Sequence, residues 1–312
     1  MKQLVILSGK GGTGKTSVAA AFAHLSCEGP SPSKAVLADA DVDAANLELV
    51  LRPQRLEAHD FTGGSVAVID PERCQGCGVC EQVCRFEAIL SPSPQDGSAA
   101  GGQGYAIDSI ACDGCAACVY QCPEEAIRME AQIAGRWYRS ESRYGPLFHA
   151  DIYPAQENSG KLVTLVKQNA RLCALDGDYP IIIVDGPPGI GCPVISAAAG
   201  ASLALIVAEP TVAGIHDLKR VLQTTTHFRI PALVVINKAD IYPQGAAQIE
   251  AVCAELGVDL IGQIPFDPTV TEAMLNGEPV TAYRAESPSS QALIAIWQIV
   301  SAWLVPPGGT NA

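Results

Sequence analysis

The sequence has no block of basic residues and is short of positive charge altogether. Its 312 residues include 20 Lys and Arg against 33 Asp and Glu, which gives a formal net charge of −13. Nucleic acids and anionic membranes attract positively charged surfaces, so this balance argues against either as a partner. A long hydrophobic run is missing too. No stretch of 18 or more apolar residues occurs, and we expect no transmembrane helix.

The first residues also lack the charged and apolar regions of a secretion signal, because the chain leads directly into a strand-like segment. We therefore expect a cytoplasmic protein. In that compartment its 12 cysteines point to metal binding rather than to disulfides. The hydrophobic fraction of 48% is enough for a large α/β core, and we expect the apolar segment 291–305 to pack on that core as a helix.

A glycine-rich stretch near the start carries the clearest functional pattern. Residues 4–7 are apolar and predict a buried strand, and the residues from Ser17 onward predict a helix. Between them the chain reads G-K-G-G-T-G-K-T, which fits the phosphate-binding pattern G-x-x-x-x-G-K-[ST]. The glycines let backbone N–H groups point at phosphate oxygens, and the helix adds its positive end. The nucleotide-binding residues expected here are Gly9, Lys10, Gly11, Gly12, Thr13, Gly14, Lys15 and Thr16.

Two lysines and a threonine of this loop have separate expected roles. Lys15 is expected to reach the β- and γ-phosphates, and the Thr16 hydroxyl to help hold Mg²⁺. With Lys10 in second place, the loop resembles the deviant Walker A motif of the MinD/ParA/Mrp and nitrogenase iron protein ATPases. The resemblance implies an ATP-dependent homodimer in which Lys10 contacts the partner's nucleotide and takes part in catalysis with Lys15. A solvent-exposed loop charge is the alternative for Lys10.

Acidic residues follow two further apolar runs. Asp39 and Asp41 come at and after the run 35–38, and Asp185 follows the run 181–184. In α/β sheets ligands bind beyond the carboxyl ends of the strands, where these residues fall. Resemblance to the same ATPases implies that Asp41 orients the attacking water, Asp39 supports the site and Asp185 holds Mg²⁺ through water. It also implies that Gly189 senses the γ-phosphate through its N–H. Capping of a helix is the alternative for Asp41.

The nucleobase is expected to contact two later segments. Asn237 opens the string N-K-A-D, and by family resemblance it contacts the base. The same string matches the guanine-reading motif of GTPases, so GTP stays an alternative to ATP. Residues 260–267 resemble the family's last strand and base-flanking loop, which places Pro265 at the nucleotide.

Eight of the cysteines form two copies of one pattern, C-x₂-C-x₂-C-x₃-C. This is the spacing of bacterial ferredoxins with two [4Fe–4S] clusters, in which the fourth cysteine of each copy binds the other copy's cluster. We expect that fourth cysteine to begin a helix. The predicted ligand sets are Cys74, Cys77, Cys80 and Cys122 for one cluster, and Cys112, Cys115, Cys118 and Cys84 for the other.

Zinc is the alternative occupant, because paired C-x₂-C units also form tetrahedral sulfur sites. The triple cysteine run and its duplication favour iron–sulfur clusters. Cys192 lies seven residues after Asp185, the offset at which a cysteine of the nitrogenase iron protein binds a cluster shared between subunits. We carry the hypothesis that Cys192 pairs across a dimer as a metal or redox site, against the alternative of a small buried cysteine.

The predicted fold is α/β, a doubly wound and mostly parallel P-loop NTPase formed by residues 1–62 and 135–312. An α+β ferredoxin-like domain is inserted at 63–134 and contains a flexible segment at 91–104. This combination resembles MinD-superfamily P-loop ATPases with an inserted ferredoxin domain.

Three functions remain open on these grounds. The first is an ATPase that couples nucleotide-driven switching of a homodimer to low-potential electron transfer to a redox partner. The second is a protein that assembles or carries iron–sulfur or metal cofactors for a client protein. The third is a MinD/ParA-like positioning ATPase, which the acidic charge disfavours because it would bind a membrane or DNA.

Overall fold

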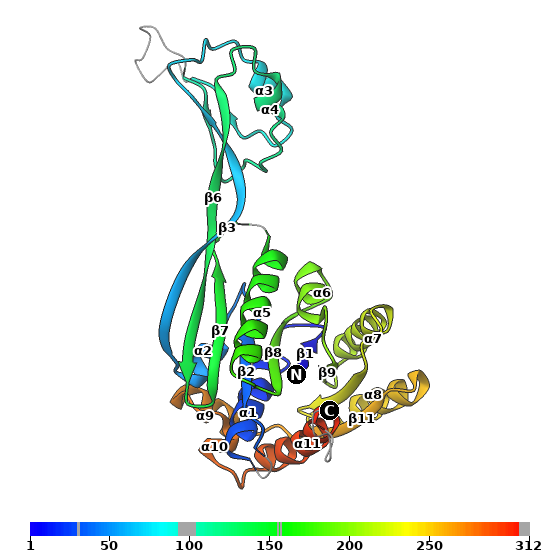
Figure 1. Ribbon diagram of the computed structural model, residues 1–312. Coiled ribbons are helices and arrows are strands. Elements are labelled where there is room, and N and C mark those ends of the chain that lie inside the picture. Colours follow the sequence, from blue (N-terminus) through cyan, green and yellow to red (C-terminus); the bar gives the residue numbers. More distant parts are fainter. Residues whose placement is uncertain (30–31, 93–103, 155, 157, 306–312) are drawn as a thin grey trace. The chain divides into compact units, whose positions relative to one another are not determined.

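The computed structural model describes residues 1–29, 32–92, 104–154, 156 and 158–305. These form two compact units (Figure 1). Unit 1 comprises Met1–His59, Arg136–Asp151 and Ser159–Ala312, and unit 2 comprises Asp60–Gly135 and Ile152–Asn158. Most of the segment predicted to be flexible, 93–103, lies outside the described residues. Within the described residues, no helix is both long enough and apolar enough to cross a membrane.

Unit 1 is organised by a sheet in the strand order β11-β10-β9-β1-β8-β2-β7-β6-β3. The strands from β11 to β7 pair in parallel. Their centres are continuous apolar runs such as Leu4–Leu7, as expected of parallel strands covered on both faces. The α/β prediction is confirmed here. The parallel strands are β1 (Lys2–Ser8), β2 (Ala35–Asp39), β7 (Gly145–Ile152), β8 (Ile181–Pro188), β9 (Leu203–Ala208), β10 (Ala232–Asn237) and β11 (Asp259–Ile264).

Helices supply the rest of the core of unit 1. Leu4 and Ile6 of β1 share one apolar cluster with α1 and α11, in which the Phe22 and Trp297 rings lie 4.9 Å apart. The helix expected from the apolar C-terminal segment is confirmed as α11. The helices are α1 (Lys15–Glu28), α2 (Leu47–Leu51), α5 (Ser159–Asp176), α6 (Cys192–Ala198), α7 (Val212–His227), α8 (Pro243–Leu256), α9 (Pro268–Asn276), α10 (Val280–Tyr283) and α11 (Pro288–Leu304).

Two long strands complete the sheet and belong to both units. They are β3 (Gln54–Ile69) and β6 (Ile127–Ser142). Residues 54–59 of β3 and 136–142 of β6 belong to unit 1, and the rest of each strand belongs to unit 2. β6 is joined to its sheet neighbour β7 by only two residues, so these two strands form an antiparallel hairpin. Each long strand therefore continues without a break from the nucleotide-binding fold into the cysteine-rich unit.

Unit 2 repeats one local structure at a spacing of 38 residues, the distance from Cys74 to Cys112. Each copy has a short helix, α3 (Val79–Val83) in the first and α4 (Ala117–Gln121) in the second. The short strand β4 (Ile89–Leu90) follows α3, and the short strand β5 (Ala106–Ile107) precedes α4. Equivalent residues share a left-handed backbone, as in the pair Gly78 (φ 74°) and Ala116 (φ 60°). The copies are therefore conformational repeats as well as sequence repeats.

Reciprocal backbone bonds join the two copies. The Asp70 N–H donates to the Ala126 carbonyl at 2.7 Å, and the Asp108 N–H donates to the Ala88 carbonyl at 2.9 Å. Both pairs stand in equivalent positions of the repeat. Each copy thus starts on a hydrogen bond to the end of the other, and β4 pairs with β5 in an antiparallel ladder.

One local expectation about the cysteines is wrong. Cys84 and Cys122 do not begin helices; they end α3 and α4, with extended backbone (φ −74° at both). The helix in each copy occupies the residues before the fourth cysteine, and a turn with a left-handed residue, Glu87 or Glu125, follows it. Each five-residue helix ends at its fourth cysteine because the backbone there is extended, and the left-handed residue that follows does not continue an α-helix.

Candidate functional site

The phosphate loop lies between the end of β1 and the start of α1. Gly12 and Gly14 have left-handed backbones, φ 76° and 97°, which favour glycine. A Cβ on Gly14 would lie 2.4 Å from the Asn237 amide nitrogen, so a larger residue does not fit there. Asn237 itself donates to the Thr13 carbonyl at 2.7 Å. The loop is thus held in a tight turn by the end of β10.

Lys15 is almost fully enclosed, with 5% of its surface exposed. Burial lowers the pKa of its ammonium, while the nearby carboxylates of Asp185, Asp41 and Asp39 raise it in part. The predicted phosphate-contacting lysine and the three predicted acids are therefore brought together by the ends of β1, β2 and β8. A buried cation beside carboxylates and a glycine loop is suited to bind a phosphate–metal complex.

Asp185 is the least satisfied polar group of this cluster. It is 1% exposed, and neither carboxylate oxygen accepts a hydrogen bond from the described residues. Burial raises the pKa of Asp185 to about 7; the nearby Thr16 hydroxyl and Lys15 lower it in part. That hydroxyl acts by proximity, because it does not reach hydrogen-bonding geometry. A buried carboxylate without a donor, next to a threonine hydroxyl, fits the donor set of a Mg²⁺ ion.

Asp39 and Asp41 lie in the turn after β2. Asp39 is fully buried and accepts two backbone N–H groups, from Asp41 at 3.1 Å and from Leu47 at 3.0 Å. Burial and the neighbouring Asp185 carboxylate raise the pKa of Asp39 well above its usual value. Asp41 is half-buried and burial raises its pKa. Asp39 thus fixes the backbone of this turn, and Asp41 presents a second carboxylate beside Lys15.

Of two further residues with predicted roles, Gly189 makes another hydrogen bond and Cys192 is exposed. The Gly189 N–H donates to the Ser8 carbonyl at 2.9 Å, so it would have to leave this bond to reach a phosphate. Cys192 is exposed at the first position of α6. Its exposure contradicts the alternative of a buried packing cysteine.

A pocket beside the loop is lined by Gly14, Asn237, Pro265 and Phe266 and encloses about 470 Å³ of space free of protein atoms, open solvent included. Asp240, the last residue of the string N-K-A-D, does not line it. Its carboxylate instead accepts the Phe266 N–H at 2.6 Å. Asn237 and Pro265 therefore lie where a nucleobase next to this loop would be bound, whereas Asp240 supports the loop behind it.

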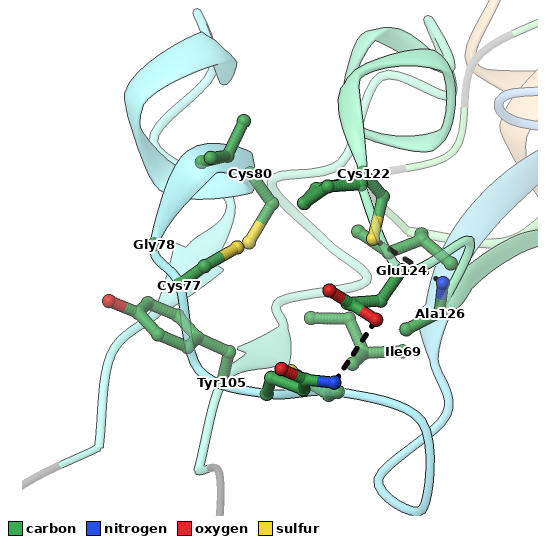
Figure 2. Close-up of a pocket in the computed structure, with 13 residues that line it drawn as sticks. Ile69, Cys77, Gly78, Cys80, Tyr105, Cys122, Glu124 and Ala126 are labelled. Carbon is green, nitrogen blue, oxygen red and sulfur yellow. Dashed lines mark hydrogen bonds between the residues drawn. The ribbon is translucent and has the colours of Figure 1, made fainter.

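Four cysteines of unit 2 surround a second pocket (Figure 2). Figure 2 shows Cys77 and Cys80 on one side of it and Cys122 on the other. The space free of protein atoms is about 330 Å³, open solvent included. The Cys122 sulfur also accepts the Ala126 N–H at 3.3 Å. The four cysteines lining this pocket are Cys74, Cys77, Cys80 and Cys122.

Equivalent cysteines lie together in the second copy. Burial raises the pKa of the Cys118 thiol, and the neighbouring Cys112 and Cys115 raise it further. Cys84 packs against the same apolar cluster as Cys112. In the described part of the chain, no three His, Cys, Asp or Glu side chains converge closely enough to hold a single metal ion. The four cysteines of the first pocket line it without forming such a single-metal site.

A family profile decides what kind of fold this nucleotide site belongs to. The CobQ/CobB/MinD/ParA nucleotide-binding domain matches residues 4–280. The chain belongs to this family. It is a P-loop ATPase of the MinD/ParA type.

Individual relatives agree with this assignment. An uncharacterized protein of Methanocaldococcus jannaschii is 32% identical over 241 residues, 76% of this chain and 78% of its own. A cytosolic Fe-S cluster assembly factor Nubp1 homolog of Drosophila grimshawi is 31% identical over 139 residues, 38% of this chain and 45% of its own. The septum site-determining protein MinD of Pyrococcus horikoshii, solved with Mg-ADP, is similar in fold, with a TM-score of 0.56, 20% identity and coverage of 96% and 95%. The iron–sulfur clusters stay a prediction.

One residue of this MinD/ParA-type site escaped the sequence analysis. Glu209 follows β9 and binds both Lys10, at 2.6 Å, and Lys238, at 2.8 Å. Burial raises the pKa of Glu209, but the hydrogen bonds from the two lysines outweigh it and the pKa is lowered. The signal that could have found it is its place at the carboxyl end of a parallel strand, which Asp39 and Asp185 share.

Proposed function

We propose that this protein is a MinD/ParA-type ATPase that couples ATP binding and hydrolysis in unit 1 to two [4Fe–4S] clusters in unit 2. The observation that carries the proposal is the position of Cys122. It lines the pocket formed by the three cysteines of the other copy, as a two-cluster ferredoxin requires. The same chain holds a phosphate loop and an unpaired buried carboxylate suited to Mg²⁺.

The cluster ligands we propose form two sets that each combine both copies. Clusters bound there would accept and release single electrons at a potential set by hydrogen bonds to sulfur and by exposure. The protein supplies both influences. Ala126 donates its N–H to the Cys122 sulfur, whereas Cys77 and Cys115 are exposed. The ligand sets are Cys74, Cys77, Cys80 and Cys122, and Cys112, Cys115, Cys118 and Cys84.

In unit 1 we assign the nucleotide contacts to the phosphate loop and the acids around it. Lys15 would neutralise the β- and γ-phosphates, and Thr16 and Asp185 would hold Mg²⁺. Asp41, whose carboxylate is half-buried beside Lys15, would orient the water for hydrolysis. Lys10 would reach the partner's nucleotide in an ATP-dependent homodimer, which requires it to leave Glu209.

ATP is the proposed nucleotide rather than GTP. Guanine recognition by an N-K-x-D string needs a free aspartate beside the base. Here Asp240 accepts the Phe266 N–H and does not line the pocket beside the loop. Adenine binding does not require the Asp240 carboxylate.

Delivery of clusters to a client protein is the second candidate function. Two observations favour it: the exposure of Cys77 and Cys115, and the likeness of part of the chain to an iron–sulfur cluster assembly factor. At an exposed ligand, a client's thiolate could bind the iron and displace the donor cysteine as a thiolate, with no change of oxidation state. Transfer of iron and sulfide to an apo-ferredoxin, stimulated by Mg-ATP, would favour this function over electron transfer. A MinD/ParA-like positioning role is disfavoured by the net charge of −13, because it would require binding to a membrane or DNA.

The proposal is tested by an anaerobic redox titration followed by EPR, with and without Mg-ATP, on wild type and Lys10→Ala. Iron analysis should first give about eight iron atoms per chain, four for each cluster; zinc in their place would contradict the proposal. The expected result is two cluster signals whose potential shifts with nucleotide in wild type only. Clusters that ignore ATP would rule out coupled electron transfer and leave the assembly function.

A further inference from the structure

A network of ionic and polar side chains in unit 1 joins α2 to three strands of the sheet. Glu48 of α2 accepts two hydrogen bonds from Arg55 of β3, at 2.9 and 3.1 Å. The same carboxylate lies 3.4 Å from Nδ1 of His149 on β7. His149 is fully buried, and its Nε2 lies 2.9 Å from the Ser140 hydroxyl of β6. Arg55 also stacks on the Tyr138 ring at 4.2 Å. The Glu48 carboxylate is thus hydrogen-bonded to Arg55 of β3, and Arg55 contacts Tyr138 of β6. Toward β7 the carboxylate lies near His149, whose Nδ1 makes no hydrogen bond in the described residues.

The other end of this network is the nucleotide site. Asp39 binds the N–H of Leu47, the residue before Glu48, with one carboxylate oxygen and the N–H of Asp41 with the other. Asp39 also shares its buried surroundings with Asp185, whose charge raises its pKa. A change in charge or position at these acids therefore acts on the first turn of α2 directly. Glu48 lies within that turn.

Two of the contacted strands continue into the cysteine-rich unit. Arg55 is on β3, which runs on through residues 60–69 of unit 2. Ser140 is on β6, which starts at Ile127 in unit 2. A strand is hydrogen-bonded along its length and transmits a shift better than a loop does. From these contacts we infer that Glu48 is a positioning residue that passes the nucleotide state of unit 1 to β3 and β6.

This inference rests on the proposed function and adds the path by which the nucleotide state of unit 1 reaches β3 and β6. The network has the features that coupling requires. Its central histidine is enclosed, burial lowers the pKa of His149, and Nε2 of the ring lies 2.9 Å from the Ser140 hydroxyl. Glu48 is one-fifth exposed and bonded to Arg55 through both oxygens, so moving α2 without moving Arg55 breaks charge-assisted bonds.

The chain offers a matched control. Glu57 also lies on β3 and also pairs with an arginine, Arg139 of β6, at 3.0 Å. Its other partner is His59 on the same strand, at 3.1 Å. Glu57 therefore resembles Glu48 in charge and type of partner, but its partners His59 and Arg139 lie on the strands and not on α2. Substitution of Glu57 tests whether any ion pair on these strands matters.

The experiment is hydrogen–deuterium exchange of the full, iron-loaded protein under anaerobic conditions, with and without Mg-ATP. It compares wild type, Glu48→Gln, Arg55→Gln and Glu57→Gln, with ATP affinity measured for each. In wild type and Glu57→Gln, ATP should change exchange at 60–69 and 127–135. In Glu48→Gln the change should be lost at both segments while ATP still binds. Arg55→Gln, at a half-exposed position that guards against misfolding, should lose it at 60–69.

Each other outcome decides against a stated idea. No ATP effect on these segments in wild type would overturn the proposed coupling and this inference together. A wild-type effect that survives in Glu48→Gln would overturn the inference alone. Loss in Glu57→Gln as well would mean that strand stability in general, and not Glu48, sets the response. Loss of ATP binding in Glu48→Gln would place Glu48 in the nucleotide site and end its role as a link.

Discussion

Lys10 and Glu209 form an ion pair within one chain, with 2.6 Å between the ammonium nitrogen and a carboxylate oxygen. Glu209 also binds Lys238, which in turn donates to the Gly12 carbonyl at 3.2 Å. The lysine proposed to reach across a dimer is thus held on its own subunit. In the proposed dimer, Glu209 would compete with the partner's nucleotide for the same ammonium group.

Glu209→Gln should release Lys10 and favour the ATP-bound dimer. The pair is partly exposed, so its loss is expected to be worth about 0.5–1 kcal/mol, or roughly a two- to fivefold lower ATP concentration at half-dimerisation. Sedimentation velocity at increasing Mg-ATP measures this. Glu272→Gln, which breaks an exposed pair with Arg284, is the control. A dimer that forms less readily in Glu209→Gln would show that Glu209 serves the loop through Lys238 instead.

Asp185→Asn should stabilise the nucleotide-free protein at neutral pH. The native pKa of Asp185 is raised from 3.8 to about 7, so between these values the native state binds a proton that the unfolded state has lost. Stability contributed by this group is therefore present below about pH 4 and is lost as pH rises toward 7. The cost at pH 7.5 is about 2–4 kcal/mol in order of magnitude.

Thermal unfolding from pH 4.5 to 7.5 checks this. The gain in melting temperature of Asp185→Asn over wild type should grow with pH. Added Mg-ATP should stabilise wild type and leave the variant nearly unchanged, because the metal ligand is gone. An equal gain at every pH would mean that Asp185 is not the titrating group.

Asn237→Ala should weaken ATP and GTP by the same factor. The amide holds the loop at the Thr13 carbonyl, and a net hydrogen bond of about 1 kcal/mol corresponds to roughly fivefold in affinity. Asp240→Ala should leave the preference for ATP over GTP unchanged, because its carboxylate binds the Phe266 N–H. Competition against a fluorescent ATP analogue measures both. If Asp240→Ala shifted the preference toward ATP and Asn237→Ala did not, Asp240 would contact guanine after all.

The crossed ligand sets can be tested by counting iron. Cys122→Ser should reduce iron from about eight to about four atoms per chain. Adding Cys74→Ser should cost no further iron, because both residues serve one cluster. Adding Cys112→Ser instead should remove nearly all of it. Cys173→Ser, outside both repeats, is the control. The opposite order of the two double variants would show that each copy binds its own cluster.

The parts of the structure that follow a local pattern were predictable. Strands such as Leu4–Leu7 and Ile181–Val184 are apolar runs that end in polar residues, and helix α11 is an apolar run as well. The repeat of 38 residues from Cys74 to Cys112 is visible in the sequence. These features depend on neighbours along the chain, and hydrophobic periodicity detects them.

The contacts that were missed join residues far apart in sequence. Glu209 meets Lys10 because β9 and β1 are adjacent strands, and Glu48 meets His149 because β2 pairs with β7. Strand order decides both, and a single sequence does not contain it. The expectation that Cys84 begins a helix failed for a different reason. Cluster geometry alone predicts that helix, whereas the actual helix begins one residue before the third cysteine and ends at the fourth.

The reciprocal bonds from Asp70 to Ala126 and from Asp108 to Ala88 limit which insertions and deletions unit 2 can tolerate in evolution. Neither half of the repeat is complete alone, because each lends the other a backbone acceptor, and the pocket around Cys77 takes its fourth cysteine from the far half. A deletion inside one half would therefore damage both. Length can vary freely only between the halves, and that is where the chain carries its Ser-, Pro- and Gly-rich stretch, 91–104.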